Sequence, residues 1–402
     1  MVAAHRLDAE HEVTLYEGDT RLGGHTQTVK VDVEGEPHSV DVGFIVYNLK
    51  TYPNFIDLLE KLDVETKPTT MSFGIACEKT GLEWASRGLR SVFAQPRNLI
   101  RPQFLRMLRD VVRFNRECRL LLLDLSNQKK SLGAYLEENG FSQQFVDHYI
   151  IPLGAAIWSA NPSQFLDFPA TTFVRFFDNH GLLQARPDHP WRVVTGGSQR
   201  YVEKLFATFR GERRLGCAVQ EVQRFTDHVE VRSGDGSAHF DHVVIATHSD
   251  QALALLSDPS PEEETILGAI RYQPNDVVLH SDTSLMPSSP DAWACWNYRI
   301  PAESQSRALL TYDMNRLQGI QSTKPLLVTL NDEGRIKPEQ VHGRYCLSHP
   351  VFNEEALEAQ QQHHTINGTR RTHYAGAYWG YGFHEDGVKS ALTACDSILG
   401  TN

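Results

Sequence analysis

The sequence predicts an α/β protein of two domains, one built on a parallel sheet and the other inserted into it. Its 402 residues, 41% of them apolar, are enough for more than one core. Strand-like segments gather at the start, middle and end of the chain, whereas residues 76–190 are mainly helical in pattern and residues 256–344 are mixed. We therefore expect a discontinuous first domain of residues 1–75, 191–255 and 345–402. It is interrupted by an α+β domain of residues 76–190 and 256–344 with a mixed or antiparallel sheet.

The first segment begins with helical spacing and then turns to strands. Residues 1–10 are expected to end a helix, and residues 11–17 (HEVTLYE) to form a short strand that ends in Glu17. A glycine-rich loop follows over residues 18–24. Two strands at 29–33 and 39–42 flank a turn, and residues 52–63 are expected to be a helix.

The later segments alternate in the same way. Helices are predicted at 99–123, 132–139 and 143–151, and a loop leading into a helix at 191–205. Residues 218–247 have a β pattern with a Gly-Asp-Gly turn, and further strands are predicted at 277–280, 308–312 and 326–330. The chain closes with a strand at 373–376, an aromatic glycine-rich loop and a helix at 387–399.

Charge and cysteine spacing exclude several classes of function. The net charge of −11 argues against a nucleic-acid partner, because the phosphate backbone needs a basic surface. No run approaches the eighteen apolar residues of a membrane-spanning helix, so we expect a cytoplasmic protein. The six cysteines form no CxxC pair and no cluster with metal-ligand spacing is present, which predicts neither disulfides nor a metal site.

The first chemical signal is the strand that ends in Glu17. An acid at this point of a dinucleotide-binding βαβ unit accepts hydrogen bonds from the adenosine ribose hydroxyls. Arg21, Gly23 and Gly24 follow: paired glycines let a backbone approach a ligand closely, and an arginine neutralises a pyrophosphate. On these residues alone, a solvated strand end followed by a plain turn stays an alternative.

With His25 and Thr26, this pattern resembles the amine oxidase and phytoene desaturase superfamily of FAD enzymes. Three later segments agree in order. Residues 40–44 (VDVGF) resemble the strand and glycine beside the flavin ring, and residues 195–198 (TGGS) the glycine pair before the return to the FAD domain. Residues 241–247 (DHVVIAT) resemble the strand that closes the nucleotide fold, and Val219 lies where the backbone meets the adenine.

The C-terminal segment 376–388 (GAYWGYGFHEDGV) resembles the last FAD motif of the superfamily, in which amides at a helix start face the flavin and its phosphate-ribityl arm. This version is similar to a bacterial subfamily of NAD- or FAD-binding oxidoreductases and to the N-terminal domain of plant cyclopropane fatty acid synthases. Segments 293–298 and 310–318 extend the resemblance over essentially the whole chain. Ala377 departs from it, since many amine oxidases have an acid there.

The resemblance implies a Rossmann-like FAD-binding domain, a second domain that binds substrate, and FAD as the cofactor. The residues that it implies for FAD contact are Glu17, Arg21, Gly23, Gly24, His25, Thr26, Val42, Gly43, Phe44, Val219, Ala246, Thr247, Gly376, Ala377, His384, Asp386, Gly387 and Val388. The first strand and GxGxxG loop of the family are missing from this sequence. We expect the true start to lie upstream of Met1; the alternative is a chain that begins here and binds FAD poorly.

The implied activity is that of a flavin-dependent oxidoreductase, which removes hydride from a C–H bond of an apolar substrate, with a small molecule or a fatty-acyl lipid as candidates. An amine oxidase is one alternative, and a non-catalytic FAD-fold partner of a lipid-modifying enzyme is another. No catalytic base is evident. Aromatic residues expected to line the pocket, each alternatively a core residue, are Tyr47, Trp158, Trp296, Tyr312, Tyr378, Trp379 and Tyr381.

One basic helix stands apart from these motifs. Arg106, Arg109, Arg113 and Arg116 recur at spacings that place them on one helix face, and Leu105, Leu108 and Val112 are expected to form its apolar side. Such a helix on an acidic protein is either a solvated surface or a peripheral contact with anionic lipid at the inner face of the membrane.

Overall fold

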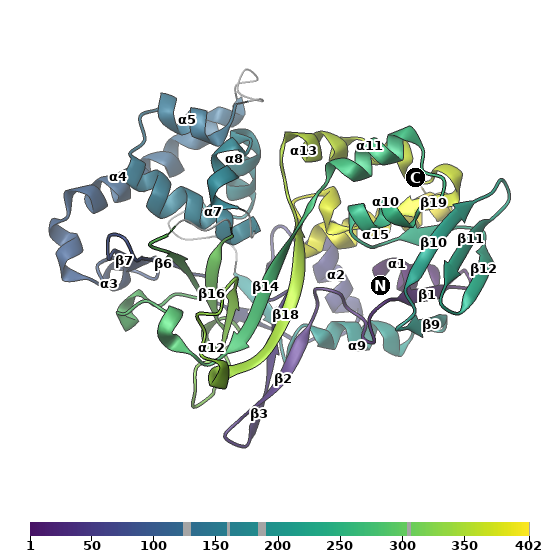
Figure 1. Ribbon diagram of the computed structural model, residues 1–402, viewed down its shortest axis with the longest axis horizontal. Helices are drawn as coiled ribbons and strands as arrows, with labels where there is room; N and C mark the ends of the chain where they lie inside the picture. Colours follow the sequence, from purple (N-terminus) through teal and green to yellow (C-terminus); the bar gives the residue numbers. More distant parts are fainter. Residues whose placement is uncertain (124–129, 159–160, 184–189, 304–306, 402) are drawn as a thin grey trace.

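The computed structural model describes residues 1–123, 130–158, 161–183, 190–303 and 307–401, and it has the mixed α/β architecture that the sequence predicts. Figure 1 shows the helices α4 (Pro102–Glu117), α5 (Leu132–Glu138), α7 (Ile151–Trp158) and α8 (Ala170–Asn179) at one end of the molecule. Both termini lie toward the other end, and the long strands β14 (Tyr272–His280) and β18 (Val341–Pro350) run between the two.

The parallel part of the fold consists of two strand pairs. β1 (Thr14–Glu17) pairs with β9 (Glu212–Leu215), and β13 (Val243–Ile245) pairs with β19 (Thr372–Tyr374), both in parallel. Within the described ranges no hydrogen-bonded strand joins the two pairs. Helices α1 (Val2–Leu7) and α15 (His384–Leu399) connect them instead, because Leu7 and Ala391 share one apolar cluster with Val13 and Val244 from the two sides.

A hairpin extends from this region. β2 (Thr28–Val33) and β3 (Glu36–Asp41) are antiparallel, and their turn places Glu34 at φ 55° and Gly35 at φ 88°. Two positive φ values are what a type I′ turn needs, and this turn matches the twist of the flanking strands. Val31 and Val33 are buried while their neighbours Lys30 and Asp32 are exposed, the alternation of a strand with one face on the core.

Two smaller sheets complete this part of the molecule. β10 (Val219–Arg224), β11 (Val229–Ser233) and β12 (Gly236–Phe240) form an antiparallel meander. β4 (Tyr47–Asn48), β8 (Trp191–Val194) and β5 (Thr66–Thr69) form a three-stranded sheet, so residues 191–194 are a strand where the sequence predicted a loop. The helices of this part are α2 (Pro53–Lys61), α9 (Gln199–Ala207), α10 (Ser249–Leu255), α11 (Pro261–Ala269), α13 (Glu354–Gln361) and α14 (His363–Ile366).

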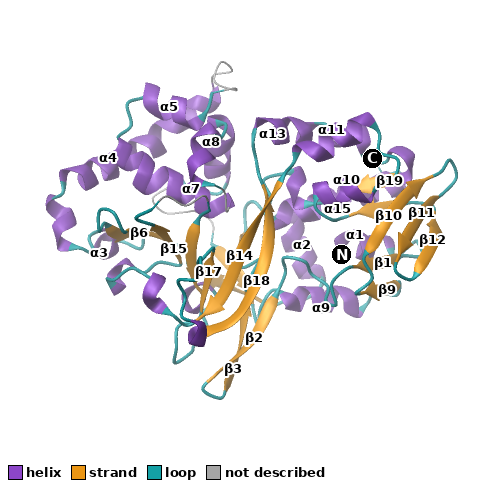
Figure 2. Ribbon diagram, viewed as in Figure 1, coloured by secondary structure: helices purple, strands orange, loops and turns teal. Residues whose placement is uncertain are grey.

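The large sheet is mixed, as the sequence predicts. Its seven strands follow the order β18-β14-β17-β16-β15-β6-β7, and only β6 and β15 run in parallel. The strands not yet given are β6 (Phe73–Cys77), β7 (Glu83–Ala85), β15 (Trp296–Ile300), β16 (Leu309–Asp313) and β17 (Leu327–Leu330). In Figure 2, β15, β17, β14 and β18 lie between the helical end and the parallel pairs, and β6 lies beside α4 and α7.

The helical end packs on a core that includes Phe104, Met107, Phe114 and Phe173. The single helix predicted over residues 99–123 is wrong: a 3₁₀ turn η1 (Pro96–Ile100), helix α4 and a second 3₁₀ turn η2 (Cys118–Leu123) follow one another. α4 begins at Pro102 because proline has no N–H for an upstream turn and disfavours helical geometry in the residue before it. Short helices α3 (Leu89–Val92), α6 (Gln143–Phe145) and α12 (Met314–Leu317) complete the fold.

The last helix starts three residues earlier than predicted, at His384. The Asp386 carboxylate accepts hydrogen bonds from the backbone N–H groups of Tyr381 and Phe383, both at 3.0 Å, and so caps the helix. Of the helices described, none is both long and apolar enough to cross a membrane.

Candidate functional site

The glycine loop begins where the parallel strand β1 ends. Glu17 is the last residue of β1, and its Oε1 accepts a hydrogen bond from the Asp19 N–H at 2.9 Å. Gly23 and Gly24 have φ values of 125° and 55°, which favour glycine, and a Cβ on Gly23 would lie 2.5 Å from the Thr26 carbonyl oxygen. The loop therefore requires glycine at Gly23 on two counts.

Arg21 holds this loop in shape. Its guanidinium donates to the carbonyl oxygens of Gly24 at 2.7 Å and Thr26 at 3.2 Å, and to the Gln27 side chain at 3.1 Å. It also forms an ion pair with Asp19 at 3.4 Å. The guanidinium N–H groups of Arg21, which we expected to contact a pyrophosphate, thus donate hydrogen bonds within the loop.

Residues 40–44, which resemble the segment beside the flavin ring, lie directly against the glycine loop. The N–H groups of Val42 and Phe44 donate to the carbonyl oxygens of Gln27 and His25, at 3.0 and 2.9 Å. A Cβ on Gly43 would lie 2.1 Å from the His25 carbonyl oxygen, so only glycine permits this approach. The structure thus brings together two segments that the resemblance placed beside the same ligand.

The C-terminal segment completes the junction. The His384 ring, at the start of α15, stacks on Phe44 with centroids 3.7 Å apart and planes at 12°. Its Nε2 lies 2.6 Å from the Tyr201 hydroxyl, which also shares a 2.6 Å hydrogen bond with Thr26. Burial lowers the pKa of His384 to about 3, so the ring is neutral near pH 7.

Three more histidine rings meet beside the glycine pair. The His25 ring lies 5.4 Å from that of His349 and 6.1 Å from that of His248, and its Nε2–H donates to the Ser348 carbonyl oxygen at 3.0 Å. Burial is the main cause that lowers the pKa of His25 to about 4 and that of His349 to about 3. The site therefore offers neutral imidazoles for hydrogen bonding. Sequence reasoning missed His248 and His349, since no local pattern points to them.

The remaining residues implied for FAD contact differ in their exposure and surroundings. Ala246 and Thr247 are exposed where β13 ends, and Val219 begins β10. By contrast, Val42 and Val388 are buried in apolar clusters. Gly376, which follows β19, donates its N–H to Ser390 at 2.9 Å, and a Cβ on Gly387 would lie 3.9 Å from Ala377.

The expected pocket aromatics do not form one cluster. Tyr47 lies in the core of α2 and α9, while Tyr378 and Trp379 pack with Tyr374 and the β10–β11 strands. The other aromatics share the apolar cluster that contains Phe104 and Phe173: Trp158 is buried within it, and Trp296, Tyr312 and Tyr381 pack against it.

The Trp296–Tyr312 pair lies on an apolar face of the seven-stranded sheet. The two residues are cross-strand partners, with ring centroids 5.2 Å apart in an edge-to-face arrangement. Register places apolar or aromatic residues beside them across the sheet, and within the paired stretches no charged side chain shares this face. The residues of this face, here called the apolar face, include Phe73, Ile75, Trp84, Trp296, Tyr298, Leu310, Tyr312, Val328, Leu330, Val277 and Leu279.

A buried aspartate, Asp41, joins the β2–β3 hairpin to the segments next to α9 and α12. The sequence analysis assigned no role to this residue. Asp41 accepts hydrogen bonds from the Ser198 N–H at 2.9 Å, the Thr28 hydroxyl at 2.6 Å and the Gln318 amide at 2.8 Å. Burial raises its pKa to about 6 despite these donors. Ser198 precedes α9 and Gln318 follows α12, so one carboxyl joins the hairpin to both.

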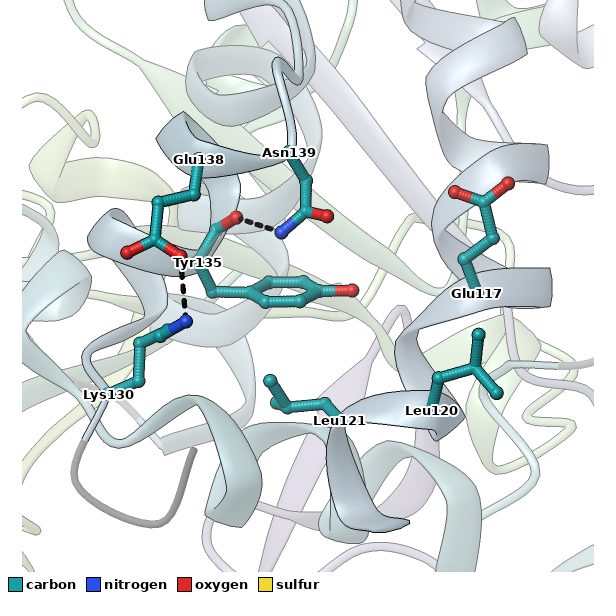
Figure 3. A pocket seen from close by; sticks show the side chains of 7 residues that line it. All are labelled: Glu117, Leu120, Leu121, Lys130, Tyr135, Glu138 and Asn139. Atoms are coloured by element: carbon teal, nitrogen blue, oxygen red, sulfur yellow. Dashed lines mark hydrogen bonds and ion pairs between the residues drawn. The ribbon is translucent and has the colours of Figure 1, made fainter. Parts of the chain in front are cut away.

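A separate cavity of about 450 Å³ lies in the helical end, between η2 and α5. Figure 3 shows Lys130 paired with Glu138 at 2.7 Å beside the ring of Tyr135, with Leu121 below it. None of the residues predicted for cofactor or substrate lines this cavity.

Comparison with known proteins gives the family and the fold of the chain. A family model described as flavin containing amine oxidoreductase matches residues 1–282, and no curated protein matches the chain. Among solved structures, the chain is similar to a cyclohexylamine oxidase from Brevibacterium oxydans IH-35A, with 14% identity, a TM-score of 0.67, and coverage of 100% of this chain and 96% of that chain. It is also similar to a CLA-producing fatty acid isomerase from P. acnes (13%, 0.64, 99% and 95%) and to a wild-type putrescine oxidase bound to putrescine (13%, 0.69, 99% and 96%). At these identities the likeness shows the fold alone.

Proposed function

Because the chain belongs to the flavin-containing amine oxidoreductases, we propose that it removes hydride from a C–H bond of an apolar substrate, with a fatty-acyl chain as the favoured class. FAD is the cofactor of this family, and the chain is a flavin-dependent oxidoreductase. When bound, FAD supplies the electron acceptor for the hydride. The protein supplies the binding surface, the orientation of the substrate and the exclusion of water.

The residues at the carboxyl ends of the parallel strands fit FAD. Glu17 is half-buried where β1 ends, and a Cβ on Gly24 would meet nothing within 4 Å, so the loop leaves room for a ligand to approach its backbone. The buried Tyr378 hydroxyl and Trp379 Nε1 have no hydrogen-bond partner among the described residues and lie in the C-terminal motif. We propose that the FAD contacts are made by Glu17, Gly23, Gly24, Ala246, Thr247 and the first turn of α15.

The apolar face is the observation that supports an apolar substrate. An ammonium group taken out of water needs a carboxylate or an aromatic cage, whereas an acyl chain needs only apolar surface. The apolar face carries Trp296 and Tyr312 and has no charged side chain in its paired stretches. His349, on strand β18 of the same sheet, reaches the histidines beside the glycine pair. Most of the apolar face is buried in the core, whereas Trp296 and Tyr312 are half-buried. A substrate that contacts these two rings would extend toward the proposed flavin site.

Anaerobic reduction of the bound flavin tests the proposal. The FAD-loaded protein is mixed with long-chain fatty acids or their thioesters, and loss of the flavin absorbance band is followed. Acyl compounds should bleach the band, and Trp296→Ala should slow the bleaching about tenfold or more, because it removes apolar contact area. Trp293→Ala, whose indole donates to the Pro287 carbonyl oxygen away from the apolar face, is the matched control. Bleaching by amines and not by acyl compounds would refute the acyl substrate.

Amine oxidation is the second candidate. Two of the similar structures are named as oxidases of putrescine and cyclohexylamine. The edge-to-face pair of Trp296 and Tyr312 presents aromatic surface that also attracts a cation. In this case amines, and not acyl compounds, should release hydrogen peroxide in air.

A further inference from the structure

Helix α4 and the turn after it present an exposed surface of alternating arginine and aliphatic residues. Leu105, Arg109, Val112 and Arg116 recur at helical spacing on the outward side of α4, and Leu120 and Leu123 are exposed on η2, which follows it. The exposed fractions are 56% for Leu99, 83% for Ile100, 42% for Leu105, 68% for Val112, 64% for Leu120 and 79% for Leu123. We call this surface, with Arg106, Arg109 and Arg116, the α4 patch.

The residues of α4 that face the core are not those of the expected apolar side. Phe104, Met107 and Phe114 fill the core, and Leu108 is half-buried, whereas Leu105 and Val112 lie outside. The expected apolar side of Leu105, Leu108 and Val112 is therefore largely exposed, and other residues of α4 fill the core. Besides the residues that pack in the core, α4 therefore has exposed apolar residues, Leu105 and Val112, between its arginines.

Charge is concentrated at the same place. Residues 87–119 contain nine arginines, no lysine and two acids, a net charge of +7 in a chain whose net charge is −11. One of the two acids, Asp110, is buried and accepts a hydrogen bond from the Ser142 N–H. Arg106 and Arg109 are exposed and have no ion-pair partner among the described residues. The remaining residues have a net charge of −18 (−11 minus +7), so residues 87–119 are a basic segment in an acidic chain, and α3 and α4 lie at one end of the molecule (Figure 1).

We propose that the α4 patch docks the protein on a membrane that contains anionic phospholipid. Arginines that alternate with aliphatic side chains fit such a membrane surface. The guanidinium groups pair with the phosphates of the headgroups, and the aliphatic side chains enter the region where the acyl chains begin. A nucleic acid has phosphates but no complement for six exposed aliphatic residues, and the acidic remainder of the protein repels it. α4 spans about 24 Å, enough for several contacts in one plane.

Vesicle flotation tests this proposal with the FAD-loaded protein. The wild type should float with vesicles of phosphatidylcholine and phosphatidylglycerol, should stay at the bottom with phosphatidylcholine alone, and should release as salt is added. Each arginine near an anionic surface contributes about fivefold to partitioning, so Arg106→Glu with Arg109→Glu should weaken binding at least about 25-fold. Leu99→Ser with Ile100→Ser leaves the charges intact and should weaken it about tenfold or more.

Arg6→Glu with Arg213→Glu is the matched control, because both arginines are exposed, lie on α1 and β9, and change the net charge equally. This control should float like the wild type. Flavin content and circular dichroism of every variant report whether it is folded. The proposal is overturned if the wild type stays at the bottom with anionic vesicles, or if the control loses binding as much as the α4 variants. Binding to RNA or to an acidic polypeptide without flotation overturns it as well.

Discussion

At Gly43 two backbones approach so closely that the residue type is dictated by distance alone. A Cβ there would lie 2.1 Å from the His25 carbonyl oxygen, with no φ in the left-handed region to add strain. The contact fixes the glycine loop against the hairpin, and the loop is where we propose that FAD binds. Close approach, and not flexibility, is therefore the reason for glycine at this position.

Gly43→Ala should lower both flavin content and the free energy of unfolding, the latter by about 1–3 kcal/mol, because the loop must move away from the new methyl group. Flavin absorbance per chain and urea denaturation measure the two effects. Gly268→Ala is the matched control: its Cβ would lie 3.7 Å from the nearest atom, and alanine in helix α11 should raise stability by up to about 1 kcal/mol. Unchanged flavin content in Gly43→Ala would contradict the role given to this contact.

Asp41 makes stability depend on pH. Its pKa is raised from 3.8 to about 6, so the folded state holds the proton more tightly than the unfolded state. The stabilisation is present below pH 4 and is lost as the pH rises through 6, by about 3 kcal/mol in total. We expect the Asp41→Asn variant to be less stable than the wild type at pH 4. Because only the wild type loses free energy of unfolding between pH 4 and pH 7, the difference between the two proteins should become smaller as the pH rises.

Denaturation of both proteins across this range measures that difference. Asp32→Asn, an exposed carboxylate on the neighbouring strand, is the control and should give a constant difference. If the Asp41→Asn difference is equally constant, the raised pKa is refuted.

At the scale of elements, a buried ion pair fastens the β10–β12 meander to the rest of the fold. Arg224 on β10 donates two 2.9 Å hydrogen bonds to the carboxylate of Glu263 on α11, which also accepts from the Tyr374 hydroxyl at the end of β19. Both charged side chains are almost fully buried. Three elements distant in sequence therefore depend on one pair.

Glu263→Ala should lower the free energy of unfolding by about 3–5 kcal/mol, because it leaves a buried guanidinium with fewer partners. The exposed pair of Arg232 and Glu221, on the same sheet, is the comparison: Glu221→Ala should cost at most about 1 kcal/mol. Thermal and urea denaturation measure both. Equal losses in the two variants would show that burial does not decide the strength of this pair.

Element by element, the sequence predicted what local pattern encodes. The β2–β3 hairpin follows from alternation and its turn, and the glycine loop from Gly23 and Gly24. β6 and β18 were missed, since their pairing partners β15 and β14 lie far away in the sequence and decide that they are strands. β7, which pairs with the neighbouring β6, was missed as well. For α4, periodicity gave the apolar side of Leu105, Leu108 and Val112, but only the fold shows that Phe104 and Met107 face the core. His349 and His248 meet His25 across long sequence separations, so no motif could have placed them.

At the scale of the whole molecule, FAD binding should appear as added stability. A ligand present at one hundred times its Kd raises the free energy of unfolding by about 2.7 kcal/mol. Glu17→Ala should raise the Kd for FAD about tenfold or more, since it removes a charged acceptor, and so should reduce the thermal shift at a fixed FAD concentration. Glu12→Ala, exposed just before β1, should behave like the wild type. A thermal shift that is the same in Glu17→Ala would remove Glu17 from the proposed site.

The packing of α1 on α15 also sets an order for folding during synthesis. The Cys395 thiol contacts the Ala3 carbonyl oxygen, and the two helices share one cluster with both parallel strand pairs. During synthesis α1 therefore cannot pack on α15 until residues near position 395 have been made. This contact has nearly the largest sequence separation that the chain allows. The helices between α4 and α8 are close in sequence and are free to fold first. A nascent chain should thus carry a folded helical end while the end with α1 and α15 is still open and exposes its apolar surfaces for longer.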